Sequence, residues 1–319
     1  MNKQLLGIHH VTAIAGNPQT NIDFYAGVLG LRLVKLTVNF DDPGTYHLYY
    51  GDGQGRPGTI LTFFPWPHGM RGRIGTGQLT TTSFAVAEQS LAYWKKRLAE
   101  PKVEFQELRS VFDESVLSFN DPDGLQLELV GTADADTSHA WNSGTVPAEF
   151  AICGFHHVTL SEEGYERTAS LLTDTMGFKP TRNNGNRFRY ALGAGGTGTI
   201  ADLVCVPAAR PGRVSVGTVH HVAWRTPGDE QQRAWQTALT DLQYNVTPII
   251  DRKYFHSIYF REPGGVLFEI ATDPPGFAVD ERADQLGSHL VLPDWLEPSR
   301  PQLEQILPKI QLPSSVKAG

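Results

Sequence analysis

Short apolar runs and amphipathic stretches alternate along the chain in a plan that recurs four times. The apolar run from His9 to Ile14 predicts a first strand. Asn17 then offers a helix N-cap with Pro18 at the first helical position, and Gly30 is placed to end that helix. Three more apolar runs follow, separated by turn residues such as Gly51-Asp52-Gly53. The pattern therefore predicts the order strand, helix, strand, strand, strand.

Helical spacing of apolar residues predicts which face of each helix is buried. The expected faces are Ile22, Tyr25 or Ala26, and Leu29 in the first module, Leu91, Trp94 and Leu98 in the second, and Ala234 or Trp235, Ala238 and Leu242 in the fourth. Pro274 and Pro275 are expected to end the last strand. A further helix over 301–310 is expected to pack against the core.

The chain repeats itself at two constant offsets. Gly7–Thr12, with the sequence Gly-Ile-His-His-Val-Thr, returns 147 residues later as Gly154–Thr159. Asp121–Leu129 returns 141 residues later as Glu262–Ile270. Two constant offsets indicate a duplicated half in which each half holds two modules.

These repeats predict an α+β fold of four βαβββ modules. We place the modules at about 5–65, 75–131, 152–207 and 215–272. The predicted division is a first pair of modules over 1–131, a polar linker over 132–151, a second pair over 152–272 and a C-terminal tail over 273–319.

The charge and composition of the chain argue against several classes of partner and location. The formal net charge of −7 and the pI near 5.9 give no electrostatic reason to expect nucleic acid or an anionic membrane as a partner. No apolar run approaches the ~20 residues of a membrane span, and the first residues lack a signal-peptide pattern. Cys153 and Cys205 have no metal-type spacing. We therefore expect a cytoplasmic protein without disulfides.

A candidate metal site lies in the fourth module. His220 and His221 open one strand, and Glu269 lies between Phe268 and Ile270 in another. An unpaired buried carboxylate costs several kcal/mol, whereas two imidazoles and a carboxylate are the ligand set of a non-haem Fe(II) site. The alternative is that Glu269 faces solvent, which the alternation of a strand also permits.

The second histidine ligand has two candidates from spacing alone. His10 opens the first module and His157 opens the third, at equivalent places in the duplicated sequence. His157 is expected if modules three and four share a sheet, and His10 if modules one and four do. Glu128 corresponds to Glu269, but module two opens with Leu79–Thr82 and offers no histidine there. We therefore expect a structural hydrogen bond or salt bridge for Glu128.

The motifs together resemble those of the vicinal oxygen chelate superfamily, which includes glyoxalases, bleomycin resistance proteins and extradiol dioxygenases. They are the His-His-Val-Thr openings, the Asp23–Tyr25 and Val28–Leu31 stretches, and the glutamate in the last strands. Four modules resemble the ring-cleaving dioxygenases, and the chain is most similar to those that act on hydroquinones. The resemblance implies open half-barrel sheets that hold a divalent metal.

The resemblance also implies the metal ligands. In the similar dioxygenases the N-terminal histidine is a ligand, which favours His10 over His157, together with His221 and Glu269. Because adjacent strand residues point to opposite faces, only one histidine of each pair can face the metal directly, and the resemblance implies the second.

Five further residues match positions that support catalysis in the similar enzymes. His9, His220 and Thr12 correspond to groups that orient the ligands or handle protons. Arg252 and Tyr259 correspond to groups that contact a substrate oxygen. For Arg252 the alternative is that it simply lies in a turn with Asp251.

We therefore expect an Fe(II)-dependent dioxygenase that uses O2 to open the ring of a hydroquinone-type aromatic substrate. Mn(II) in place of Fe(II) fits the same ligand types. The alternatives are a glyoxalase-like metal-dependent lyase or isomerase, and a non-enzymatic protein that binds quinones or drugs. The sequence leaves open whether the protein is a homo-oligomer.

Overall fold

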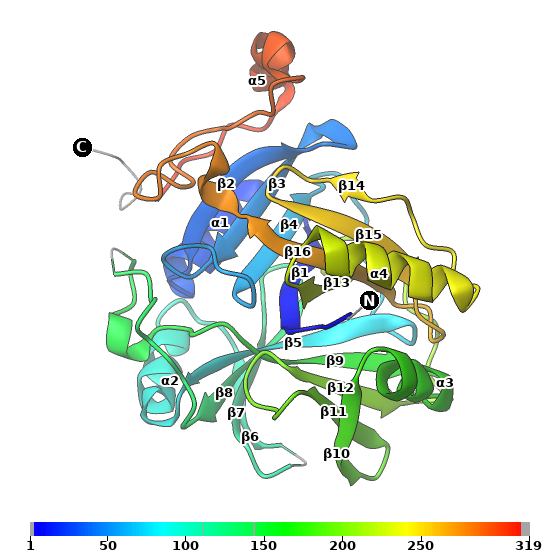
Figure 1. Cartoon of the computed structure of the whole chain (residues 1–319). Coiled ribbons are helices and arrows are strands. Elements are labelled where there is room, and N and C mark those ends of the chain that lie inside the picture. Colours follow the sequence, from blue (N-terminus) through cyan, green and yellow to red (C-terminus); the bar gives the residue numbers. More distant parts are fainter. Residues whose placement is uncertain (1–2, 111, 143, 314–319) are drawn as a thin grey trace.

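The computed structural model describes residues 3–110, 112–142 and 144–313. The predicted C-terminal tail, 273–319, is thus described as far as residue 313. Within these ranges the strand, helix, three-strand order occurs four times, and the strands form two eight-stranded sheets. The predicted α+β class is confirmed, and Figure 1 shows the two sheets one above the other.

Modules one and four form the first sheet. Module one supplies β1 (Gly7–Ala15), α1 (Pro18–Ile22) with the π-helical segment η1 (Asp23–Val28), β2 (Arg32–Asn39), β3 (Asp42–Gly51) and β4 (Ile60–Pro65). Module four supplies β13 (Thr218–Thr226), α4 (Asp229–Asp241), β14 (Ile250–Asp251), β15 (Phe255–Arg261) and β16 (Leu267–Pro275). The order is β14-β15-β16-β13-β1-β4-β3-β2, so the first strands of the outer modules lie side by side at its centre.

Modules two and three form the second sheet. Module two supplies β5 (Gln78–Ala87), η2 (Glu88–Ser90), α2 (Leu91–Ala99), β6 (Phe105–Arg109), β7 (Ser115–Asn120) and β8 (Gln126–Thr132). Module three supplies β9 (Phe155–Glu162), α3 (Glu166–Ser170), η4 (Leu171–Thr175), β10 (Phe178–Asn184), β11 (Arg187–Leu192) and β12 (Ile200–Cys205), after a 3-10 turn, η3 (Ala148–Phe150). Here the order is β10-β11-β12-β9-β5-β8-β7-β6, again with two first strands at the centre.

The predicted start and end of the first helix are confirmed. Oδ1 of Asn17 accepts hydrogen bonds from the backbone N–H groups of Gln19 and Thr20 at 2.9 and 3.1 Å, and Pro18 begins the helix. Gly30 follows the helical segment with a φ of 69°, in the left-handed region that glycine adopts at low cost.

Three expectations about the C-terminal half are wrong in detail. The last strand runs on to Pro275, which lies opposite Phe255 beyond an irregular step in the pairing. Leu242 lies just beyond α4 and is 52% exposed, because α4 packs through the expected Trp235 and through Leu239 in place of Leu242. The tail helix is shorter than expected: α5 spans Arg300–Ile306, after the turns η5 (Phe277–Val279) and η6 (Glu297–Ser299).

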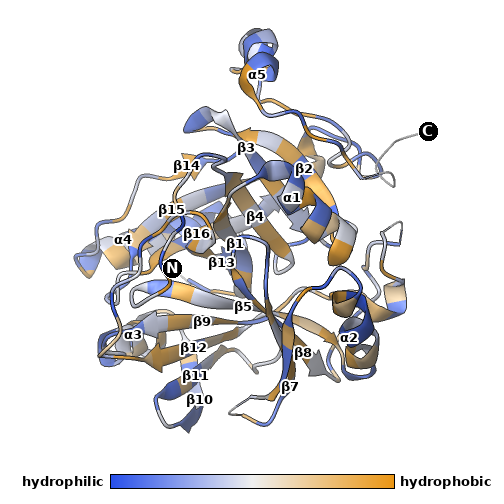
Figure 2. Ribbon diagram, turned by 180° about the vertical axis from the view of Figure 1, so that it is seen from behind, coloured by the Kyte–Doolittle hydropathy of each residue, from blue (hydrophilic) through white to orange (hydrophobic). Residues whose placement is uncertain are grey.

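Buried hydroxyl–carboxylate contacts join the two sheets along the chain. The Tyr25 hydroxyl in module one donates to Oδ2 of Asp121 in module two at 2.9 Å. Thr168 in module three donates to Oε2 of Glu262 in module four at 2.5 Å. In Figure 2 the strands carry much of the orange colour, whereas α2 and α4 also show blue residues. No helix in the described part of the chain is long and apolar enough to span a membrane.

Candidate metal centre and its pocket

Three side chains from three strands of the first sheet converge on one point. Nε2 of His10 lies 3.2 Å from Nε2 of His221 and 3.3 Å from Oε2 of Glu269. Nε2 of His221 lies 3.0 Å from the same carboxylate oxygen. All three side chains are buried. The structure thus brings together the three predicted ligands.

The pairing of β1, β13 and β16 produces this convergence. Ala223 lies opposite His10 in β1 and opposite Glu269 in β16, so the three residues share one face of the sheet. His221, two residues before Ala223, points to the same face. Because the alanine side chain is small, it leaves room between the larger side chains.

The donor atoms fit a single bound cation. Ligand atoms with metal bonds of about 2.1 Å lie about 3.0 Å apart at right angles and about 3.4 Å apart in a tetrahedron. The observed separations of 3.0–3.3 Å lie in that range. Within the described residues Oε2 of Glu269 has no hydrogen-bond partner, whereas Oε1 accepts a bond from Ser257 at 2.5 Å. One oxygen is therefore anchored and the other is directed at the histidines.

The neighbouring histidines can fix the tautomers of the candidate ligands. Nδ1 of His10 lies 2.9 Å from Nδ1 of His9, and Nε2 of His9 lies 3.2 Å from the carbonyl oxygen of Thr272. If His9 donates from Nε2 to this carbonyl, its Nδ1 accepts from His10 and leaves a lone pair on Nε2 of His10. Nδ1 of His221 has the same contact with Nδ1 of His220, at 2.8 Å.

Burial and neighbouring charges shift the pKa values of His221, His9 and Glu269. Burial lowers the pKa of His221, and burial followed by the effect of His10 lowers the pKa of His9 well below its usual value. Burial opposes the ionisation of Glu269, but the nearby His10 and His221 outweigh it and hold the pKa of this carboxyl well below its usual value. Neutral imidazoles and an ionised carboxylate are the metal-binding forms.

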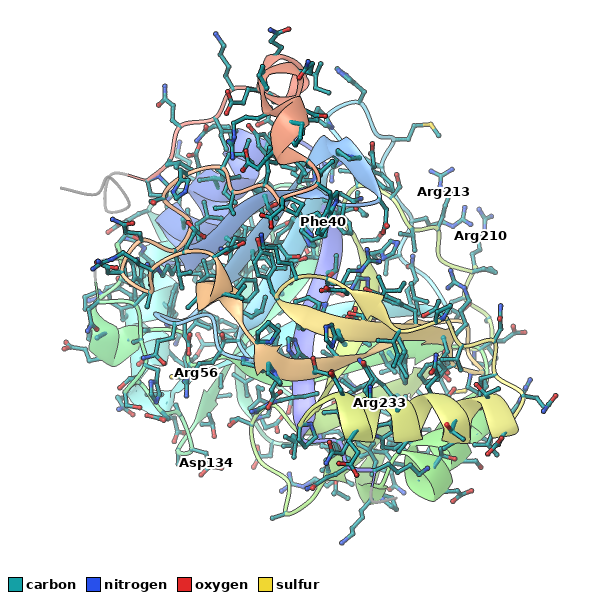
Figure 3. All side chains as sticks on the ribbon, turned by 45° about the horizontal axis from the view of Figure 1, so that its top comes forward. Phe40, Arg56, Asp134, Arg210, Arg213 and Arg233 are labelled. Atoms are coloured by element: carbon teal, nitrogen blue, oxygen red, sulfur yellow. The ribbon has the colours of Figure 1, made fainter. Side chains whose placement is uncertain are left out.

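A cavity of about 410 Å³ lies over the cluster. Its lining includes the predicted site residues His10, Thr12, His220, His221, Arg252 and Tyr259. Asn39, the last residue of β2, and Phe40 and Asp41, in the turn to β3, also line it. Phe40, labelled in Figure 3, packs against Trp295 of the C-terminal tail with ring centroids 5.6 Å apart. His9 and Glu269 are not among the lining residues and lie beneath them.

Arg252 and Tyr259 form one polar wall of the cavity. The Arg252 guanidinium lies 5.6 Å from the centre of the Tyr259 ring, and its Nη1 donates to Asp41 at 2.9 Å. The Tyr259 ring lies 5.6 Å from that of His221. Arg252 does lie in the turn after Asp251, where its backbone N–H donates to the carbonyl oxygen of Phe255 at 3.0 Å, and its side chain also lines the cavity and pairs with Asp41.

Sequence reasoning missed His47, Tyr49 and Ser257. His47 and Tyr49 line the cavity from β3, and Ser257 anchors the Glu269 carboxylate. The available signal was the i, i+2 spacing of a histidine and a tyrosine in a predicted strand, which places both on one face. Ser257 had no such signal.

His157, the alternative ligand, lies in the second sheet. Its Nε2 is 3.2 Å from Oγ of Ser83 and 3.8 Å from Oε2 of Glu128. Ser83 also donates to this Glu128 oxygen at 2.7 Å. The structural hydrogen bond expected for Glu128 is confirmed, and the ligand set near His221 includes His10 and not His157.

The paired modules and the buried His/His/Glu cluster define a glyoxalase-type fold with a candidate metal site. The profile of the Glyoxalase/Bleomycin resistance protein/Dioxygenase superfamily matches residues 7–129 and 154–270. The chain therefore belongs to this superfamily.

Relatives that match nearly the whole chain indicate which branch of the superfamily it resembles. A Bacillus subtilis (strain 168) protein named "Putative ring-cleaving dioxygenase MhqO" is 50% identical over 305 residues, 96% of each chain. The chlorohydroquinone/hydroquinone 1,2-dioxygenase of Sphingobium indicum is 36% identical over 305 residues, 93% of this chain and 94% of that one. A crystal structure of a "putative dioxygenase" from Bacillus subtilis has a TM-score of 0.93 at 48% identity, covering 98% of this chain and 99% of that one. Ring-cleaving dioxygenase homologues thus extend over nearly the whole chain.

Proposed function

We propose that this protein is an Fe(II)-dependent dioxygenase that opens the ring of a hydroquinone-type aromatic compound with O2. The observation that carries the proposal is the convergence of His10, His221 and Glu269 beneath a cavity with a largely aromatic lining. Three protein donors on one side leave coordination positions open, as in other two-histidine, one-carboxylate sites. Similarity to the hydroquinone dioxygenase of Sphingobium indicum supports the substrate class.

A bound Fe(II) or Mn(II) would be held by His10, His221 and Glu269, and would supply the redox and Lewis-acid chemistry that brings substrate and O2 together. His9 and His220 hold the ligand imidazoles through their Nδ1 contacts. Ser257 holds the carboxylate.

The cavity wall contributes binding and charge stabilisation. Arg252 presents a cation and Tyr259 a hydroxyl group on the same side of the cavity. Burial raises the pKa of Tyr259, so its hydroxyl stays protonated and can donate a hydrogen bond. A cation and a donor fixed in a low-dielectric cavity stabilise a phenolate oxygen better than water does. Phe64 and Trp66 supply apolar surface for the ring.

The proposal is tested by loading the metal-free protein with Fe(II) under anaerobic conditions. O2 uptake is then measured with hydroquinone, catechol and the methylglyoxal–thiol adduct in parallel, with Mn(II)-loaded protein as a second arm. We expect one O2 consumed per hydroquinone and a ring-opened product that carries both oxygen atoms. Conversion of the thiol adduct without O2 uptake would instead show a glyoxalase-like enzyme and contradict the proposal.

A further inference from the structure

A continuous chain of four hydrogen-bonding side chains crosses three strands beside the candidate metal site. The Tyr49 hydroxyl lies 2.8 Å from Nδ1 of His47. Nε2 of His47 lies 2.7 Å from Oγ1 of Thr62. Oγ1 of Thr62 lies 3.2 Å from Oγ1 of Thr12. The two contacts of His47 have usual hydrogen-bond lengths, and the Thr62–Thr12 contact at 3.2 Å is slightly longer than the usual range of about 2.5–3.0 Å between two oxygens. These contacts join the four groups in one chain from Tyr49 to Thr12.

Strand pairing sets the order of these groups. Thr62 in β4 lies opposite Thr12 in β1 and opposite Tyr49 in β3, so the three residues share one face of the sheet. Thr12, His47 and Tyr49 line the cavity, whereas Thr62 is fully buried. Both ends of the chain therefore reach the cavity, as does the half-buried His47, whereas Thr62 is closed to solvent.

The chain can point in two directions. In one, Tyr49 donates to Nδ1 of His47, Nε2–H donates to Thr62, Thr62 donates to Thr12, and the Thr12 hydroxyl proton is free for the cavity. In the other, every donor and acceptor is exchanged and the Tyr49 hydroxyl proton is free. The two differ by the tautomer of His47. Burial, followed by the effect of His10, holds the pKa of His47 well below its usual value, so the ring is neutral in both.

We propose that His47 relays a proton between the two ends of this hydrogen-bonded chain, from Tyr49 to Thr12 or in reverse. The relay rests on the proposed function, because an aromatic diol must lose a hydroxyl proton before its oxygen carries a negative charge. The substrate hydroxyl gives its proton to the Tyr49 oxygen while Tyr49 gives its own to Nδ1 of His47. Nε2 gives its proton to Thr62, Thr62 gives one to Thr12, and Thr12 releases one to water or to a product oxygen. One proton enters, one leaves, and all four groups end neutral.

The second sheet shows that this face of the fold does not require such a chain. By the same strand pairing, Arg189 takes the place of Tyr49 and Asp202 takes the place of Thr62. Arg189 donates to Asp202 from Nε at 2.7 Å and from Nη2 at 3.0 Å. A fixed ion pair cannot reverse its donors and acceptors, whereas the Tyr49–His47–Thr62 chain can.

Thr62 offers an isosteric test. Thr62→Val removes the one hydroxyl that joins His47 to Thr12 and keeps the side-chain shape, and Thr62→Ser restores a hydroxyl. Thr82→Val is the matched control, because Thr82 is a fully buried threonine of the second sheet with no hydrogen-bond partner for its hydroxyl within the described residues. We expect Thr62→Val to lower kcat about 100-fold, the scale of positioned proton transfer, with KM and bound metal per chain unchanged. Thr62→Ser should recover most of the loss, and Thr82→Val should match the parent protein.

His47→Gln separates a relay from a static bridge. An amide can donate to one neighbour and accept from the other, but it cannot exchange these roles by tautomerisation. A relay predicts that His47→Gln loses kcat as Thr62→Val does, and that the solvent isotope effect on kcat in D2O differs from that of the parent protein in both variants. Parent-level kcat in either variant, equal losses in Thr62→Val and Thr62→Ser, or loss of bound metal in Thr62→Val would overturn the relay. A parent protein that takes up no O2 with any aromatic diol would instead contradict the proposed function.

Discussion

The two half-barrel sheets share one architecture but differ in the groups that balance the negative charge of their buried carboxylates. In the first, His10, His221 and Glu269 direct three donors at one point beneath a cavity. In the second, strand pairing places Thr81 where His221 stands and Ser118 where Tyr259 stands.

An internal arginine supplies the cation of the second sheet. The Arg189 guanidinium binds Asp202 and Glu114, and Arg189 is only 5% exposed. Burial opposes ionisation of Glu114, but Arg189 outweighs it and lowers the pKa of this carboxyl. After duplication, one copy thus balances its buried carboxylates with its own side chain, whereas the other keeps three donors that match a metal ion.

Matched substitutions of the equivalent glutamates should give the largest difference between the sheets. Glu269→Gln removes the charge that holds a cation between two neutral imidazoles, so we expect loss of most bound metal and of nearly all activity in a protein that stays folded. Glu128→Gln should leave both unchanged, because Glu128 lies in the second sheet, where it accepts a bond from Ser83 and is not among the candidate metal ligands. Metal analysis and circular dichroism check both. Full metal content in Glu269→Gln would remove this residue from the ligand set.

Tyr259→Phe should give the next largest effect. The variant keeps the ligands and the aromatic ring but loses the hydroxyl donor of the cavity wall, so we expect full metal content and a kcat lowered about 100-fold. Steady-state O2 uptake with hydroquinone measures this. Ser118→Ala, at the equivalent place in the second sheet, is the control and should leave kcat unaltered; an unaltered kcat in Tyr259→Phe would show that its hydroxyl does not reach the substrate.

The sequence alone predicts part of the fold and part of the candidate metal site. The two repeat offsets predicted the four modules, and alternation within strands predicted that one histidine of each pair faces the metal. The resemblance to the ring-cleaving dioxygenases implied the second of each pair, His10 and His221, which lie together in the structure. To choose between His10 and His157 one must know which modules pair. That pairing depends on contacts between strands far apart in the sequence, and the duplicated sequences favour both choices equally. Ser257 and Thr62 act through hydroxyl groups that the strand register brings next to their partners. No local sequence pattern predicts such positions.

Arg189→Met should lower the stability of the fold and leave the catalytic activity unchanged. Removing the guanidinium takes Arg189 away from Glu114 and leaves Asp202 with Arg187, whose Nη1 lies 3.2 Å away, and breaking a buried ion pair from one side costs about 3–5 kcal/mol. Urea unfolding measures this loss, and kcat per folded chain should stay at the parent value. A drop in bound metal would show that the second sheet supports the metal site directly.

The junction between the two sheets offers the smallest effect, visible as a pH dependence. Ala15 in the first module corresponds to Glu162 in the third, whose carboxyl is fully buried without a hydrogen-bond partner within the described residues. Burial and the nearby Glu262 raise the pKa of Glu162 to about 8 from 4.5. The folded state thus holds this proton more tightly, so the contribution is complete below about pH 4.5 and is lost as the pH rises through about 8.

We therefore expect the free energy of unfolding to fall between about pH 5 and 8, and Glu162→Gln to flatten this slope. Urea unfolding across that range checks it, with Glu163→Gln, the neighbour in sequence, as the control. An identical slope in Glu162→Gln and the parent protein would place the proton elsewhere.

Iron per chain in His10→Ala and His157→Ala, purified and loaded side by side, tests the central claim most directly. The two histidines occupy equivalent places in the duplicated sequence, yet only His10 lies near His221 and Glu269. We predict that His10→Ala loses its iron, and that His157→Ala binds as much iron as the parent protein and loses only stability. Full iron in His10→Ala together with loss of iron in His157→Ala would contradict the assignment of the metal site to the first sheet.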